Sequence, residues 1–448
     1  MDLTEKRTFK KAKNKELYVK MDNYCYLSKN LYNATNYIIK QSYRIHQKIK
    51  DHKLLEPWES ELLFEINKEI SEYNRGKEDN KRMQYIDNFN GFMANAYFLS
   101  WYMLRHGNDF RAMPYSNSAQ ICIQNLCKNW KSFYKSMKEY KKDRSKFNGK
   151  PNPPKYLDKN KGRGSVEISG AFIESTGETL NLPKFLSLLH IRTDKKVKLL
   201  RIRMKNDEVV VEIVYEATQK PEAGNPANVM AIDLGVNNLC AITFSTEAEP
   251  VVINGRPLKS INQYYNKRRA ELQSVADKNG HKTTNRIKKL TGKRNNKVKD
   301  FLHKTSRIVV DLAVQNGISE IIIGKNKNWK QEVSMGKVTN QNFVSIPFDT
   351  LINYITYKAE LEGIKVVLID EAYTSGTSCL DNEKACKKNY NKSRRKQRGL
   401  FVSNDGRQIN ADVNASYQIM RNELSINICK VETVHMRSIP HTKKKKPA

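Results

Sequence analysis

A long apolar segment is the first thing that this sequence lacks. Its 448 residues contain no run of about 18 apolar residues, the length needed to cross a bilayer. The amino-terminal stretch MDLTEKRTFKKAKNKE is charged and has no apolar core of the kind that signal peptides carry. We therefore expect neither membrane insertion nor export.

Cysteine is scarce and scattered. The seven cysteines include no CxxC pair and do not form the dense framework that staples small secreted domains. This usage fits a reducing compartment. We expect an intracellular protein.

Acidic residues are few. The 80 lysines and arginines outnumber the 47 aspartates and glutamates, which gives a formal net charge of +33 and a pI near 9.7. A folded chain with so much like charge repels itself unless a polyanion neutralises it. Because hydrophobic residues still make up 39% of the chain, we expect a globular protein whose partner is nucleic acid.

Hydrophobic periodicity divides the amino-terminal half. Apolar and aromatic residues recur at three- and four-residue steps over 24–140, as expected for helices. The prolines of the basic segment 141–163 exclude a helix there. Over 166–216 the period shortens to two, and LLRIRMKNDEVVVEIVYEA predicts a β-hairpin whose turn lies at 205–207.

The carboxy-terminal half predicts an α/β domain. A turn-rich linker at 221–228 precedes three strands, VMAIDLG, LCAITFS and PVVING, and basic amphipathic helices at 260–315. Two buried strands, ISEIIIG and IKVVLIDE, flank another helix. Residues 374–410 form a long basic loop, after which ADVNASYQIMRNEL is expected to close the core as a helix.

Two aspartates stand at the ends of these elements. Asp233 ends the apolar strand MAID, where desolvating a carboxylate costs several kcal/mol unless a cation compensates. Asp412 opens the last helix. The alternatives are a turn-forming aspartate at 233 and an ordinary helix cap at 412. In a basic chain, however, two such carboxylates favour a shared Mg²⁺ or Mn²⁺ site, since hard divalent ions prefer oxygen ligands.

The motifs around both aspartates resemble a known family. AIDLGVNNL resembles the first RuvC motif of TnpB proteins, which are transposon-associated RNA-guided nucleases, and of type V CRISPR effectors. NADVNASYQIMR resembles their third motif. Five other segments also resemble TnpB proteins, so the likeness spans most of the chain. They are YTSGTSCLDNE, RRKQRGLFVSNDGRQINADVN, KNLYNATNYIIKQSY, NWKSFYKSM and FNGKPNPPKY.

The resemblance implies a multidomain α+β fold. A helical recognition lobe (23–160) would be inserted in a β-barrel wedge domain (1–22 and 161–220). After the linker (221–228) would follow a RuvC-like, RNase H-like α/β nuclease domain (229–448).

It also implies an activity. The protein would carry a guide RNA and cleave guide-complementary double-stranded DNA beside a short adjacent motif, by two-metal-ion phosphodiester hydrolysis.

The second RuvC motif departs from the family. Relatives end this strand in glutamate, whereas this chain has Gly324, and Glu320 lies about 13 Å away at about 3.3 Å per residue. The neighbouring strand ends in Asp370 and Glu371, and adjacent strands lie about 4.8 Å apart. We therefore predict Glu371 as the third catalytic metal ligand beside Asp233 and Asp412, with Asp370 as second choice. A surface acid at a strand end is the alternative.

The family's zinc site is not expected here. Many relatives place two CxxC pairs between the second and third motifs, where this chain offers only Cys379 and Cys386. The loop 374–410 is expected to contact nucleic acid through its cations. They are Lys384, Lys387, Lys388, Arg394, Arg395, Lys396 and Arg398.

Other residues are predicted to contact nucleic acid. Arg268 and Arg269 lie on the outward face of the basic helices, and Tyr115 and Asn117 fall where relatives read the adjacent motif. Most of the interleaved aromatics, such as Trp130, are expected to pack in the core and not to stack on bases.

Other functions could use the same motifs. A compact type V CRISPR effector would share the chemistry and differ in the origin of its RNA. A nuclease-dead RNA-guided repressor would explain Gly324, but the presence of Asp233 and Asp412 disfavours it. A strand-transfer transposase could use the same core, but the amino-terminal half disfavours it. The sequence leaves the guide, the adjacent motif and the oligomeric state open.

Overall fold

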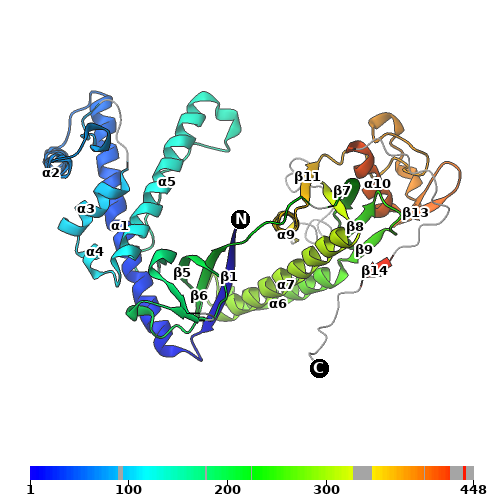
Figure 1. The fold of residues 1–448 in the computed structure, drawn as a ribbon, viewed down its shortest axis with the longest axis horizontal. Coiled ribbons are helices and arrows are strands. Elements are labelled where there is room, and N and C mark those ends of the chain that lie inside the picture. Colours follow the sequence, from blue (N-terminus) through cyan, green and yellow to red (C-terminus); the bar gives the residue numbers. More distant parts are fainter. Residues whose placement is uncertain are drawn as a thin grey trace. The chain divides into compact units, whose positions relative to one another are not determined.

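The fold is known from a computed structural model that describes residues 1–88, 94–176, 179–222, 224–325, 346–397, 399–423 and 437–439. Arg398 lies outside these ranges. The chain divides into two compact units, Asp2–Ala217 and Thr218–Ala448, each described by itself (Figure 1). No helix in the described ranges is long and apolar enough to cross a membrane.

Helices build much of the first unit. They are α1 (Lys15–Lys50), α2 (Pro57–Asn74), α3 (Ala96–His106), α4 (Asn108–Ala112) and α5 (Ser116–Lys142). Their apolar stripes meet in one core, in which Trp130 is fully buried and donates its ring N–H to Asn36 Oδ1 at 2.9 Å. Helices occupy most of the described part of 24–140, as expected, but α1 begins at Lys15, inside the segment assigned to the wedge domain.

An antiparallel sheet completes the first unit. Its strands are β1 (Asp2–Lys10), β2 (Val166–Ser169), β5 (Val197–Lys205) and β6 (Glu208–Glu216), in the order β1-β6-β5-β2, and a separate hairpin joins β3 (Glu174–Thr176) to β4 (Thr179–Asn181). The predicted hairpin is confirmed, with Asn206 at its turn in the left-handed region (φ 55°). Because β1 and β2 both lie at edges of the described sheet, the sheet is open, and the expected closed barrel is not observed.

A six-stranded sheet organises the second unit. Its order is β11-β10-β7-β8-β9-β14, with β7 parallel to β10 and antiparallel to β8. The strands are β7 (Asn225–Asp233), β8 (Asn238–Phe244), β9 (Val251–Asn254), β10 (Ile318–Gly324), β11 (Lys365–Ile369) and β14 (Arg437–Ile439). The predicted linker 221–228 is wrong in its second half, because Asn225 already pairs with Ile318 as the first residue of β7.

Helices cover both faces of this sheet. They are α6 (Arg256–Lys278), α7 (Asn285–Gln315), α9 (Phe348–Leu361) and α10 (Ala411–Glu423). Met230 and Ile232 of β7 face α7 and α9, whereas Val229 and Ala231 pack with residues of α10. A strand buried on both faces reads as a continuous apolar run, which is why the periodicity of two disappears here. Figure 1 shows α6 and α7 lying side by side as a long pair.

The loop between β11 and α10 is folded. Two short strands, β12 (Leu400–Val402) and β13 (Gln408–Asn410), pair within it. Phe401, Ile409 and Cys379 are buried against Val413 and Tyr417 of α10. The sequence predicted only a basic loop in this region.

Candidate active site

Three parallel strands end at one edge of the six-stranded sheet. Ile323 pairs with Ile232, and Gly324 pairs with Ile369, so the last residues of β7, β10 and β11 lie in neighbouring positions. Since side chains alternate along a strand, Asp233 follows Ala231 onto the face covered by α10. The carboxyl ends of parallel strands are where α/β sheets gather their ligands.

Glu371 lies over Gly324. A Cβ atom placed on Gly324 would stand 2.7 Å from Glu371 Oε2, 3.2 Å from Glu371 Cβ and 2.5 Å from Ile419 Cδ1 of α10. The Glu371 side chain therefore occupies space that a side chain at 324 would need, on the face that carries Asp233. The exposed Asp370 accepts the Ala372 N–H at 3.1 Å, and Glu320 forms an ion pair with Lys365 at 3.0 Å.

Asp412 comes to the same edge from the first turn of α10. It is not the cap of that helix, because the Asn410 side chain accepts the backbone N–H groups of Asp412 and Val413 at 3.0 and 3.2 Å. Asn238, at the start of β8, donates to Asp412 Oδ2 at 2.8 Å, and Arg395 donates to Oδ1 at 3.2 Å. The capping alternative for Asp412 is thus wrong.

The surroundings of this edge disfavour the ionised forms of the Asp233 and Glu371 carboxyl groups. Burial raises the pKa of Asp233 well above its usual value, and the carboxylates of Asp412 and then Glu371 raise it further, while Arg395 opposes them. Burial and the neighbouring Asp370 raise the pKa of Glu371 to about 7. A bound cation would relieve this mutual repulsion. Carboxylates that repel one another in this way therefore favour the binding of a metal cation.

The carboxylates are not yet gathered as a closed ligand set. Across the described ranges, no three side chains of His, Cys, Asp or Glu are grouped so that they could hold a metal ion as they stand. Arg395 supplies positive charge beside Asp412 instead. The carboxylate oxygens suit a hard divalent ion by their chemistry, and all three side chains belong to element ends at one edge of the sheet.

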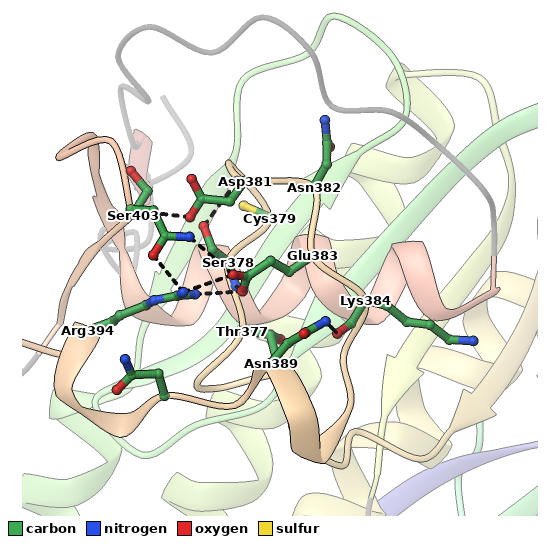
Figure 2. Close-up of polar contacts among 12 residues, drawn as sticks. Thr377, Ser378, Cys379, Asp381, Asn382, Glu383, Lys384, Asn389, Arg394 and Ser403 are labelled. Carbon is green, nitrogen blue, oxygen red and sulfur yellow. Dashed lines mark hydrogen bonds and ion pairs between the residues drawn. The ribbon is translucent and has the colours of Figure 1, made fainter.

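A polar network holds the loop 374–410 together (Figure 2). Arg394 binds Glu383 through two hydrogen bonds of 2.6 and 2.9 Å, and it also donates to Asn404 at 2.7 Å. The Ser378 N–H donates to the same Glu383 carboxylate at 2.9 Å. Burial alone would raise the pKa of Glu383, but these donors outweigh it and lower the pKa. The pair thus joins the two arms of the loop.

The same network ties the loop to α10. Gln418 donates to the backbone oxygen of Glu383 at 3.1 Å, and Arg421 donates to that of Asn382 at 2.8 Å. Asn414 accepts the Cys379 N–H at 2.9 Å and donates to the Thr377 oxygen at 2.8 Å. The loop is therefore fixed to the helix whose first turn carries Asp412.

The two loop cysteines behave as ordinary thiols. Cys379 is fully buried, and burial raises its pKa to about 12, so it is a protonated core residue. Cys386 is partly buried, and neither cysteine forms a disulfide.

The predicted nucleic-acid residues differ in what they contact. Arg394 and Arg395 form the ion pairs described above. Six other cations are exposed, namely Lys384, Lys387, Lys388 and Lys396 of the loop and Arg268 and Arg269 of α6. By contrast, the Tyr115 ring packs against the rings of Phe172 and Phe185, and Asn117 Oδ1 accepts the Ser169 N–H at 3.0 Å. All of these assignments stay predictions, and the last two residues also have structural roles.

Sequence reasoning missed three residues of this region. Asn238 and Asn410 support Asp412, and Glu383 anchors Arg394. Asn238 lies within the first motif, and Asn410 stands at the position where helix caps occur, so both had a local signal. Glu383 had none, because its partner is eleven residues away in a loop.

Two family matches cover this unit. OrfB_IS605, described as "Probable transposase", matches residues 212–330, and the Cas12f1-like TNB domain matches residues 348–419. The first match includes Asp233, and the second includes Glu371 and Asp412.

Individual relatives agree with the family matches. A TnpB-like protein of Methanocaldococcus jannaschii is 23% identical over 191 residues, which cover 40% of this chain and 64% of the relative. The CRISPR-associated endodeoxyribonuclease Cas12f1 of Sulfoacidibacillus thermotolerans is 27% identical over 174 residues, which cover 37% of this chain and 40% of the relative. The chain thus spans less than two thirds of the length of these relatives.

The chain also matches solved structures of type V effectors. A cryo-EM structure of a Cas12f1–sgRNA–target DNA complex matches with a TM-score of 0.36 and 13% identity, covering 94% of this chain and 100% of that one. The family matches and the curated relatives thus show that the second unit is similar to TnpB-type proteins and to the type V CRISPR effectors.

Proposed function

We propose that the protein is an RNA-guided DNA endonuclease that cleaves guide-complementary double-stranded DNA in a RuvC-like site. The observation that carries the proposal is that Asp233, Glu371 and Asp412 stand at neighbouring element ends on one edge of the sheet, where the charges of Asp412 and Glu371 raise the pKa of Asp233. The relatives named as endodeoxyribonucleases support a nuclease.

The sheet supports a RuvC-like, RNase H-like assignment. In that fold, three antiparallel strands are followed by two parallel strands beside the first, and β7 to β11 have this order. The first unit, with its helices and open sheet, would then serve as the recognition lobe and wedge domain. Its residues would bind the guide RNA and the motif adjacent to the target.

Asp233, Glu371 and Asp412 would hold Mg²⁺ or Mn²⁺. A pair of such ions, when bound, stabilises the attacking and leaving oxygens of phosphodiester hydrolysis. Asn238 keeps one oxygen of Asp412 oriented, and Gly324 leaves the space through which Glu371 reaches the edge. Arg395 must move from Asp412, or share it, when the metal binds.

The charge of the chain supports a resident RNA. A net charge of +33 requires a polyanion, and base pairing with a guide explains sequence selection without a recognition helix. Purification followed by sequencing of the bound RNA should recover a structured RNA with a common scaffold. Short, heterogeneous fragments would contradict the proposal.

Cleavage tests the site directly. With its RNA, the protein should cut matched DNA only when Mg²⁺ or Mn²⁺ is present, and Asp233→Ala, Asp412→Ala and Glu371→Gln should abolish cutting while RNA binding survives. Asp370→Asn is the matched control and should cut normally. Normal cutting by Asp233→Ala would refute the assignment.

A second outcome separates the alternatives. If the unmodified protein binds its matched target and never cuts, the nuclease-dead repressor replaces the endonuclease. A compact CRISPR effector and a transposon protein have the same chemistry, so the genomic source of the recovered RNA distinguishes these two.

A further inference from the structure

The first half of α7 and the turn before it contain no acidic residue. Residues 278–299 hold nine lysines and arginines and neither aspartate nor glutamate. The nine are Lys278, Lys282, Arg286, Lys288, Lys289, Lys293, Arg294, Lys297 and Lys299. The second half of the same helix is different, because Lys304 pairs with Asp300 at 2.6 Å and Arg307 pairs with Asp311 at 2.7 Å.

Most of these cations point to solvent. Ile287 and Val298 are buried and mark the inward side of α7. With 3.6 residues per turn, Lys289 and Asn296 fall opposite these two residues, with Lys293 close by. The side chains of Arg286, Lys288, Lys289, Lys293, Lys297 and Lys299 are exposed, and we call them the basic face of α7.

Arg294 is the exception, because it points inward. Its guanidinium donates to Asn262 Oδ1 of α6 at 2.8 Å and lies 5.6 Å from the centre of the Tyr265 ring. Tyr265 in turn shares a hydrogen bond of 3.0 Å with Thr291. These contacts join α7 to α6, so the basic face stands on a helix whose rotation is fixed.

Gly292 interrupts the basic face. It lies inside the helix, where glycine is less favourable than alanine because it loses more conformational freedom. A Cβ atom there would meet no described atom outside the backbone of its own helix within 4 Å, and the backbone does not adopt a positive φ. Neither packing against the described residues nor backbone geometry therefore requires glycine at this position. Its neighbours one turn away are Lys288, Lys289, Asn295 and Asn296.

We propose that the basic face of α7 binds the sugar-phosphate backbone of an RNA duplex, with Gly292 at the point of closest approach. Without a side chain at 292, a strand can lie against the helix backbone while the flanking lysines reach its phosphates. This inference rests on the proposed function, which supplies a resident RNA, and it assigns that RNA a docking surface.

The asparagines favour RNA over DNA. Asn285, Asn295 and Asn296 are interleaved with the cations, and amide groups both donate and accept hydrogen bonds. The 2′-hydroxyl groups of RNA also do both, and they line the wide, shallow minor groove of an A-form duplex. The sugars of DNA lack this hydroxyl group.

Charge removal is the first test. Affinities of the RNA-stripped full chain for a double-stranded RNA, and for a DNA duplex of the same sequence, would be measured over a range of salt concentrations. Each phosphate contact adds about 0.9 to the slope of log affinity against log salt, so Lys289→Gln with Lys293→Gln should reduce the slope for RNA by about 2. Lys304→Gln, whose cation is already paired, should leave it unchanged.

Gly292 provides the sharper test. Gly292→Ala should raise the melting temperature by about 2–4 °C, because alanine favours the helix. The same variant should weaken RNA binding several-fold, and Gly292→Leu should weaken it more. A merely structural role for Gly292 cannot produce higher stability together with weaker binding.

Each negative result has a distinct meaning. Unchanged RNA binding by both Gly292 variants would overturn the close approach. Equal affinities and slopes for RNA and DNA would overturn the choice of RNA. If the lysine variants bind and cut normally with their co-purified RNA, this surface is wrong, and the proposed endonuclease stands. If no structured RNA is recovered from any variant or from the unmodified protein, the proposed function itself fails.

Discussion

The loop 374–410 and the first half of α7 are both rich in cations, yet they use them differently. In the loop, Arg394 pairs with Glu383, Arg395 with Asp412 and Arg407 with Asp405. In α7, residues 278–299 contain no acid with which a cation could pair. The number of cations in a segment therefore does not tell how many are available to a ligand. The acids within reach decide it.

Removing Arg394 should have the largest effect on stability. The side chains of Arg394 and Glu383 are only 14% and 17% exposed, so Arg394→Ala leaves a shielded carboxylate without its cation. We expect a loss of about 2 kcal/mol, below the value for fully buried pairs because some water reaches the site. Urea unfolding of the metal-free protein measures it, with the exposed Lys396→Ala as control. An unchanged midpoint of urea unfolding would show that the Arg394–Glu383 ion pair does not stabilise the protein.

The pH dependence of stability should identify Glu371. Its pKa is raised to about 7 by burial and by Asp370, above the ordinary value of 4.5. A raised carboxyl pKa stabilises the fold fully below the ordinary value, and this contribution is lost as pH rises from about 4.5 through about 7. In the Glu371→Gln variant, the melting temperature of the metal-free protein should therefore depend less on pH between these two pH values. Asp370→Asn keeps Glu371 but removes the charge that repels its carboxylate. The loss of stability with rising pH should therefore occur at lower pH.

Replacing Arg395 should change metal binding more than folding. The ion pair with Asp412 is partly exposed, with side-chain exposures of 38% and 26%, so its contribution to stability is small. Arg395→Ala removes the cation that competes for Asp412, and we expect Mn²⁺ to bind the metal-free protein several-fold more tightly by calorimetry. Lys388→Ala serves as the control. Equal or weaker Mn²⁺ binding would mean that Arg395 does not compete at this carboxylate.

The smallest effect on folding is expected on the basic face of α7. Lys288→Gln and Lys299→Gln remove exposed cations that have no acidic neighbour in the run, so the melting temperature should stay unchanged. Relief of repulsion between like charges would raise it slightly. A clear loss of stability would show that these lysines stabilise the fold. The cations of α7 would then not differ from the paired arginines of the loop 374–410.

Local patterns predicted the elements that place the site. The apolar runs that end at Asp233, Gly324 and Ile369 were sufficient to predict neighbouring strand ends, because buried strands depend on short stretches of sequence. The position of Glu371 followed from the spacing of strands and is supported by its contact with the space above Gly324. The spans of the long helices followed from their apolar spacing.

Contacts between distant residues were not predictable in this way. The pairing of Glu383 with Arg394, and of Asn414 with Thr377, depends on the path of an irregular loop. The start of β7 at Asn225 was also missed, because the turn-forming residues of 221–228 concealed a strand that pairs with β10. The end of the wedge segment at residue 22 came from the family resemblance, and α1 begins before it, at Lys15.

Gly324 also constrains how this lineage could have evolved. A glutamate at 324 would collide with the Glu371 side chain and with Ile419, so the two positions compete for one volume. The atoms nearest to a side chain at 324, Glu371 Oε2 and Ile419 Cδ1, are ends of side chains, so both would have to shift to admit it. We therefore expect homologous sequences to carry a glutamate at one of the two positions more often than at both.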